Sequence, residues 1–95
     1  MKVRQIKTND VFSIELINSP STGYLWQFKR NDGITLTNRH MRPKDQVATI
    51  GGEVVETFFF RADTPGEYIL EIAKTRPWEK NSNPIEVYRE KILIN

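Results

Sequence analysis

Apolar residues recur at every second position along much of this 95-residue chain, and this spacing strongly limits the folds that it can adopt. The alternation is clearest in residues 12–16, 24–28, 54–60 and 68–72. A period of two places the apolar side chains on one face of an extended strand. Within 54–60, Val55, Thr57 and Phe59 fill the opposite face, which favours a central strand buried on both sides near its end. The pattern therefore predicts β-strands.

Turn residues separate these strands. The sequence Asn31-Asp32-Gly33 tolerates positive φ angles and predicts a hairpin that joins the strand 24–28 to one containing Ile34 and Leu36. A second turn is expected at residues 63–66, where proline and glycine follow one another.

The last apolar run, residues 85–94, is ambiguous between a strand and a short helix, and its β-branched residues favour the strand. Six or seven short strands without an amphipathic helix predict an all-β chain. We expect an immunoglobulin-like β-sandwich of about seven strands, with a small barrel as the alternative. A chain of this length predicts a single domain over residues 1–95.

Composition and charge exclude several classes of protein. The net charge is only +2 and the basic residues are scattered, which argues against a nucleic-acid-binding arm. Without cysteine, the chain has no disulfide, thiolate nucleophile or cysteine zinc site. No apolar run is long enough for a signal peptide or a membrane span. We expect no membrane association, and a cytoplasmic location, or a secreted one if a signal peptide has been removed.

Catalysis is not expected from the titratable residues. His40, the one histidine, lies in a basic stretch that we interpret as an exposed loop, and it has no second imidazole or thiolate at metal-ligand spacing. Glu67 and Glu71 alternate on a strand, which favours a solvated face over a catalytic pair. The pair Gly51-Gly52 lacks the lysine of a phosphate-binding loop. The sequence predicts neither an enzyme nor a bound metal or cofactor.

Three connecting segments, residues 18–23, 38–52 and 74–84, are longer than minimal turns require. Taken alone, the proline and glycine of the first and the paired glycines of the second indicate ordinary bends. The third segment carries Arg76-Pro77-Trp78. A tryptophan stiffened by proline and flanked by a guanidinium suits an interface anchor, and a tryptophan folded over the sandwich edge is an equal alternative.

Together, and in this order, the three segments resemble the chagasin family, whose members inhibit papain-like cysteine peptidases. The matching stretches are Ser19-Pro20-Ser21-Thr22-Gly23-Tyr24-Leu25-Trp26, Thr49-Ile50-Gly51-Gly52 and Arg76-Pro77-Trp78-Glu79. The chain departs from the family pattern at Ser19, Ser21 and Thr49, which stand where the family has Asn, Thr and Gly.

The resemblance implies an immunoglobulin-like inhibitor that blocks the peptidase cleft with three loops, reversibly and without a covalent bond. The residues implied to bind the peptidase are Pro20, Ser21, Thr22, Gly23, Ile50, Gly51, Gly52, Arg76, Pro77 and Trp78. The implied partners are cathepsin L-like and cathepsin B-like peptidases, and we expect a monomer when the inhibitor is free. Ala48 and Ile50 are both candidates for the specificity pocket.

Two other functions remain open at this point. One is a non-inhibitory immunoglobulin-like module that uses the same loops to contact another protein. The other is a nucleic-acid binder with an exposed stacking face of Tyr24, Trp26 and Phe28. We expect instead that Tyr24 and Trp26 belong to the core.

Overall fold

The computed structural model describes residues 1–19, 23–44, 52–79 and 83–95, and these residues contain seven strands. The strands are β1 (Lys2–Ile6), β2 (Phe12–Asn18), β3 (Leu25–Phe28), β4 (Thr35–Pro43), β5 (Val54–Arg61), β6 (Gly66–Thr75) and β7 (Glu86–Ile94). The described ranges contain no helix of the length and hydropathy that crossing a bilayer requires.

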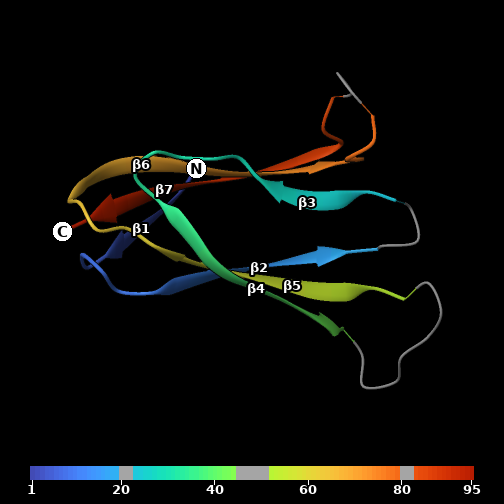
Figure 1. The fold of residues 1–95 in the computed structure, drawn as a ribbon, viewed down its shortest axis with the longest axis horizontal. Coiled ribbons are helices and arrows are strands. Elements are labelled where there is room, and N and C mark those ends of the chain that lie inside the picture. Colours follow the sequence, from blue (N-terminus) through green and yellow to red (C-terminus); the bar gives the residue numbers. More distant parts are fainter. Residues whose placement is uncertain (20–22, 45–51, 80–82) are drawn as a thin grey trace.

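Two sheets form the layers of the sandwich (Figure 1). One has the order β1-β7-β6-β3 and the other the order β2-β5-β4. All neighbours are antiparallel except β1 and β7, which run parallel side by side. The architecture confirms the predicted all-β, immunoglobulin-like sandwich. It also confirms that residues 54–60 form a central strand and that the ambiguous run 85–94 is a strand.

The core lies between the two sheets and consists of the side chains that the period of two places inward. Its residues with no exposed surface include Phe58, Phe60, Leu70, Ile72 and Ile92. Trp26 belongs to the same cluster, with 2% of its surface exposed. The predicted core position of Trp26 is therefore confirmed, and a nucleic-acid-stacking face that includes it is excluded. The predicted core position of Tyr24 is wrong, because Tyr24 is only half-buried and lies outside the core cluster.

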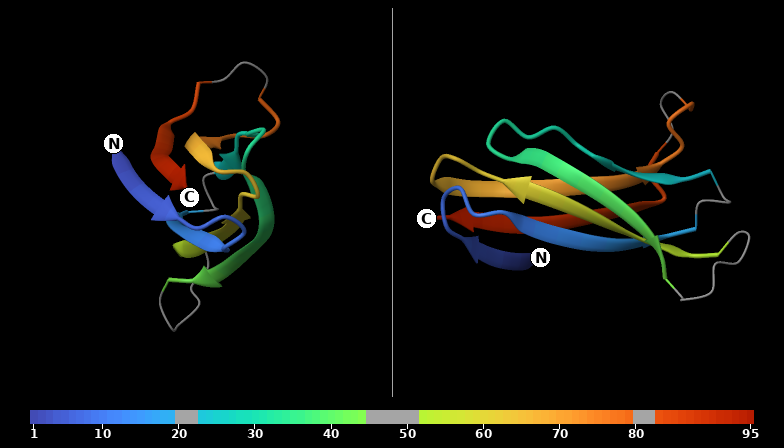
Figure 2. Two further views of the ribbon diagram at one scale, coloured as in Figure 1. Left: turned by 90° about the vertical axis from the view of Figure 1, so that its left-hand side faces the viewer. Right: turned by 60° about the horizontal axis from the view of Figure 1, so that its bottom comes forward.

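The predicted hairpin between residues 24–28 and 34–36 is wrong. The turn itself forms, with the backbone N–H of Ile34 donating to the carbonyl of Asn31. However, β3 pairs with β6, whereas β4 pairs with β5 in the other sheet (Figure 2). Phe28 and Leu36 both pack against the core, from opposite layers. The segment 29–34 therefore crosses from one sheet to the other. As a result, the apolar side chains of both β3 and β4 face the core between the sheets.

The edge strands differ from expectation as well. Residues 38–43 were expected in a connection but belong to β4, so the exposed His40 lies on an edge strand and not on a loop. Its ring packs edge-on against Phe59, with the ring centroids 5.6 Å apart. The strand β1 was not expected at all. Both strands are rich in polar residues because sheet edges face water and are protected from further pairing by charge.

Two glutamates inside the sandwich were also unexpected. Glu56 and Glu90 have no exposed surface, and each pairs with an arginine. Arg39 Nη2 lies 2.8 Å from Glu56 Oε1, and its guanidinium lies over the ring of Phe58. A buried carboxylate needs such partners, because leaving it unpaired in a medium of low dielectric constant is costly.

Glu90 lies in a larger cluster that connects the two sheets. Arg4 on β1 contacts both oxygens of Glu90 on β7, at 3.1 Å each, and also donates to the carbonyl of Ser13 on β2 at 2.8 Å. The hydroxyl of Tyr88 donates to Glu90 Oε1 at 2.8 Å. Burial and this hydrogen bond to a carboxylate raise the pKa of Tyr88 to about 12. The cluster stabilises the neutral phenol.

Candidate functional site at the loop end

Three connections leave the sandwich at the same end, on the right in Figure 1. We call them the first (residues 19–24), second (44–53) and third (76–85) connections, and together the loop end. The strand registers bring their bases together: Val54 lies opposite both Asn18 and Pro43, and Thr75 lies opposite Leu25. The folded chain thus gathers at one end the three segments that stand far apart in the sequence.

Half of the predicted site residues are described by the structure. Gly23, Gly52, Arg76, Pro77 and Trp78 all lie at the loop end. The other five, together with Ala48, lie outside the described residues: Pro20, Ser21, Thr22, Ile50 and Gly51.

Trp78 presents most of its side chain to solvent, with 66% of its surface exposed. One edge of the indole is nevertheless in contact with the chain. A Cβ atom added at Gly23 would lie 2.6 Å from Cη2 of Trp78, which is closer than two carbons can approach. Gly23 also has a φ of 82°, a left-handed conformation that favours glycine. Glycine at position 23 therefore permits both the turn of the first connection and the position of the tryptophan.

Arg76 connects the first and third connections through its guanidinium. Its Cζ lies 4.4 Å from the centroid of the Tyr24 ring, the distance of a stacked cation–π pair. Its Nη1 pairs with Glu79 Oε1 at 3.2 Å, and the backbone N–H of Glu79 donates to the carbonyl of Arg76 at 3.1 Å. These contacts close the turn 76–79 around the exposed Pro77 and Trp78.

The base of the first connection is fixed by Asn18, a residue for which no role was predicted. Asn18 is 1% exposed, and its Nδ2 donates to the carbonyl of Tyr24 at 3.0 Å. Beside it, the indole N–H of Trp26 donates to the carbonyl of Ile17 at 3.0 Å. The one sequence signal for this hydrogen bond is Asn18 itself, a polar residue at the end of an apolar strand and six positions before its partner Tyr24.

The second connection belongs to the other sheet. It is closed at its base by Lys44 and Glu53, whose backbones are joined by a hydrogen bond of 3.0 Å and whose side chains approach to 3.5 Å. Gly52 directly precedes Glu53 and is half-buried. The structure therefore brings Gly23, Arg76 and Trp78 into one contact network, while Gly52 rises from a separate base.

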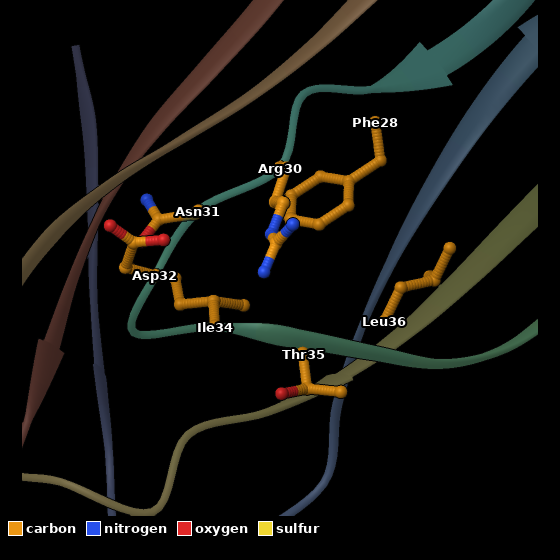
Figure 3. Close-up of a pocket in the computed structure, with 7 residues that line it drawn as sticks. All are labelled: Phe28, Arg30, Asn31, Asp32, Ile34, Thr35 and Leu36. Atoms are coloured by element: carbon orange, nitrogen blue, oxygen red, sulfur yellow. The ribbon is translucent and has the colours of Figure 1, made fainter.

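A shallow pocket of about 400 Å³ lies elsewhere, along the crossing segment between β3 and β4 (Figure 3). Phe28 and Leu36 line it from the two sheets, and Arg30 and Asp32 place opposite charges at its margin. None of the predicted site residues lines this pocket. The loop end therefore lies apart from this pocket.

The acidic residues of β6 form a solvated face, as expected. Glu71 pairs with Lys29 at 2.9 Å and with Arg89 at 2.6 Å, and Glu67 pairs with Lys91 at 3.4 Å. Hydrogen bonds from Lys29 and Arg89 lower the pKa of Glu71. A carboxylate such as Glu71, held ionised by two neighbouring cations, belongs to a structural ion pair and is unsuited to the acid–base couple of a hydrolase.

Comparison with known proteins identifies relatives of the same shape. The crystal structure of the cysteine protease inhibitor EhICP2 from Entamoeba histolytica superimposes with a TM-score of 0.84, at 23% identity, over 99% of this chain and 86% of that one. The solution structure of Amebosin gives a TM-score of 0.75 at 22% identity, over 98% of this chain and 88% of that one. Among curated sequences, Amoebiasin-2 from Entamoeba histolytica is 24% identical over 91 residues, which is 94% of this chain and 74% of the relative.

The sequence model described as "Chagasin family peptidase inhibitor I42" matches residues 5–92. The match runs from the first strand into the last, so it includes all three connections of the loop end. The two-sheet architecture agrees with this match: the chain belongs to the chagasin family of peptidase inhibitors and is not an enzyme.

Proposed function

We propose that this chain inhibits papain-like cysteine peptidases by placing the loop end in their active-site cleft. The observation that carries the proposal is Trp78, a large aromatic side chain that is 66% exposed yet packed along one ring edge against Gly23. A fixed, exposed tryptophan binds a partner with little loss of side-chain entropy. Family membership supplies the class of partner, and the relative EhICP2 is described as a cysteine protease inhibitor.

Each connection has a part in this proposal. Residues 20–23 form a slim wedge over the catalytic cysteine, residues 50–52 run along one side of the cleft, and residues 76–78 cover the other side with Trp78. Small side chains suit the wedge because a cleft between two lobes is narrow. The expected partners are cathepsin L-like and cathepsin B-like peptidases, bound by a monomeric inhibitor.

Inhibition is reversible and non-covalent in this proposal. The chain contains no cysteine that could form a mixed disulfide with the target. A wedge that does not present an aligned peptide carbonyl is bound without being cut. Binding then depends on the walls of the cleft and not on the nucleophile.

The direct experiment is titration of papain with a fluorogenic substrate, followed by cathepsin L-like and cathepsin B-like enzymes. We expect nanomolar inhibition, which corresponds to about −12 kcal/mol. Serine peptidases and metallopeptidases serve as controls and should keep full activity. Unchanged activity of all three cysteine peptidases at about 10 μM inhibitor would rule out the proposal.

A second measurement tests the mechanism. Calorimetry with a target whose catalytic cysteine is replaced by alanine should give an affinity within about tenfold of the active enzyme. Intact-mass analysis after long incubation should show an uncut inhibitor without an adduct. A loss of affinity of about a thousandfold, or a stable adduct, contradicts non-covalent binding.

A further inference from the structure

Two contacts join the first and third connections at adjacent positions. Gly23 supports the indole edge of Trp78, and the next residue, Tyr24, stacks on the guanidinium of Arg76. Because Gly23 and Tyr24 are adjacent in the chain, a shift of either residue disturbs the side chains of both Trp78 and Arg76. The second connection starts from β4 and returns to β5 in the other sheet.

We infer that Gly23 and Tyr24 of the first connection and Arg76 and Trp78 of the third act as one coupled binding unit, in which Arg76 acts on binding by positioning Trp78. The second connection binds independently of this unit. The inference rests on the proposed function, because it assigns roles within the same site.

The surroundings of Arg76 carry the positioning role. One face of its guanidinium lies on Tyr24, its Nη1 pairs with Glu79, and its Nε is buried in the free chain. A planar guanidinium held on an aromatic ring and in an ion pair is fixed in orientation. Only Pro77 separates Arg76 from Trp78, and proline restricts the backbone between them. Fixing Arg76 therefore fixes the direction in which the indole leaves the turn.

Coupling and independence make different predictions for combined substitutions. Substitutions at residues that share a contact are not additive, whereas those at separate sites are. Gly23→Ala places a methyl group where Cη2 of Trp78 lies, so it displaces the indole as well as straining its own backbone. Once Trp78 is removed, the displacement has no further effect.

The test is a set of double-mutant cycles on the dissociation constant for papain. Combining Gly23→Ala with Trp78→Ala should weaken binding at least about fivefold less than the product of the single effects. Arg76→Gln should weaken binding in the native background but by less than about twofold when Trp78 is already alanine. Ile50→Ala, in the second connection, should multiply with Trp78→Ala. The inference is overturned if the Gly23 and Trp78 losses multiply, or if Arg76→Gln costs the same in both backgrounds.

Substitutions at Tyr24 provide the matched control. Tyr24→Leu removes the ring under the guanidinium and should reproduce the loss caused by Arg76→Gln, whereas Tyr24→Phe keeps the ring and should cost less affinity. Equal effects of Phe and Leu would contradict the stacking role. Thermal melts of all variants confirm that the sandwich remains folded.

A measurement on the free chain separates this inference from the proposed function. The chain has two tryptophans, so its NMR spectrum contains two indole N–H signals. Gly23→Ala and Arg76→Gln should each shift the signal of Trp78 and leave that of Trp26, while Lys44→Gln should shift neither. Unchanged Trp78 signals would overturn the coupling whatever the inhibition. Shifted signals in a chain that inhibits no cysteine peptidase would count against the proposed function alone.

Discussion

The two tryptophans of this chain occupy opposite environments. Trp26 is 2% exposed and its indole N–H donates to the carbonyl of Ile17 inside the sandwich, whereas Trp78 is 66% exposed and touches the chain along one edge. Burying an indole during folding stabilises the folded chain. An indole that stays exposed can contribute the same free energy of burial when it binds a partner. We therefore expect substitutions in the interior to affect stability and substitutions at the loop end to affect binding.

The largest expected effect lies in the interior, at Trp26. Trp26→Ala should lower the free energy of unfolding by about 3–5 kcal/mol, because it leaves a cavity and an unpaired carbonyl at Ile17. Urea denaturation followed by circular dichroism measures this change. Any molecules that stay folded should inhibit with a normal constant. An unchanged denaturation midpoint would show that the core does not depend on Trp26.

The buried cluster around Glu90 comes next. Glu90→Gln should lower the free energy of unfolding by about 3 kcal/mol, since it leaves Arg4 facing a neutral group in a buried site. Glu67→Gln is the matched control, because its pair with Lys91 is exposed and should contribute less than about 1 kcal/mol. Equal effects of the two substitutions would contradict a special role for the interior pair.

At the loop end, Trp78→Ala should have the reverse profile. Inhibition should weaken by about 2 kcal/mol or more, as is common for interface tryptophans, while the melting temperature stays within experimental error. Inhibition constants and thermal melts of the same preparation decide the outcome. A variant that melts early but inhibits normally would show that the two tryptophans have exchanged roles.

The smallest effect is a pH dependence of the interior. The pKa of Tyr88 is raised from 10.0 to about 12 in the folded chain, so between these pH values the unfolded chain loses this proton first. The stability that the neutral phenol contributes is therefore complete below pH 10 and is lost as the pH rises towards 12.

Tyr88→Phe should reduce the loss of unfolding free energy at alkaline pH by about 1 kcal/mol. This value is smaller than the full pKa shift would give, because water partly reaches the side chain. Denaturation at a series of pH values from neutral to alkaline, compared with Tyr68→Phe, measures the difference. The same alkaline slope in native and Tyr88→Phe chains would contradict the assignment. Inhibition should not change with either substitution.

Much of the fold could be predicted from the sequence because alternation marks strands with one buried face. It identified the positions of β2, β3, β5, β6 and β7, whose inward residues are large and apolar. It failed at β1 and at the outer half of β4, where an edge strand exposes charged residues and hides the period. It also paired β3 with β4, because a tight turn between apolar runs does not reveal whether the chain stays in one sheet.

The segments proposed for the site could be located from the sequence, but their contacts could not. The motifs were predicted to lie on three connections, and the fold brings Gly23, Gly52 and Trp78 of these connections to the loop end. Sequence alone could not show that Gly23 supports Trp78, because 55 positions separate them and only the fold brings them together. The buried glutamates had a readable signal: Glu56 stands in phase with Phe58 and Phe60, on the face that the alternation directs inward.

The parallel pairing of β1 with β7 has a consequence for folding during synthesis. Synthesis produces β1 before β7, which is its one sheet neighbour among the described strands, and Arg4 meets Glu90 across 86 positions of chain. Contacts so distant in sequence form slowly. Until they form, the incomplete sheet exposes an unpaired strand edge that is prone to aggregation. The sheet that contains β1 can therefore be completed only after residues 86–94 have been synthesised.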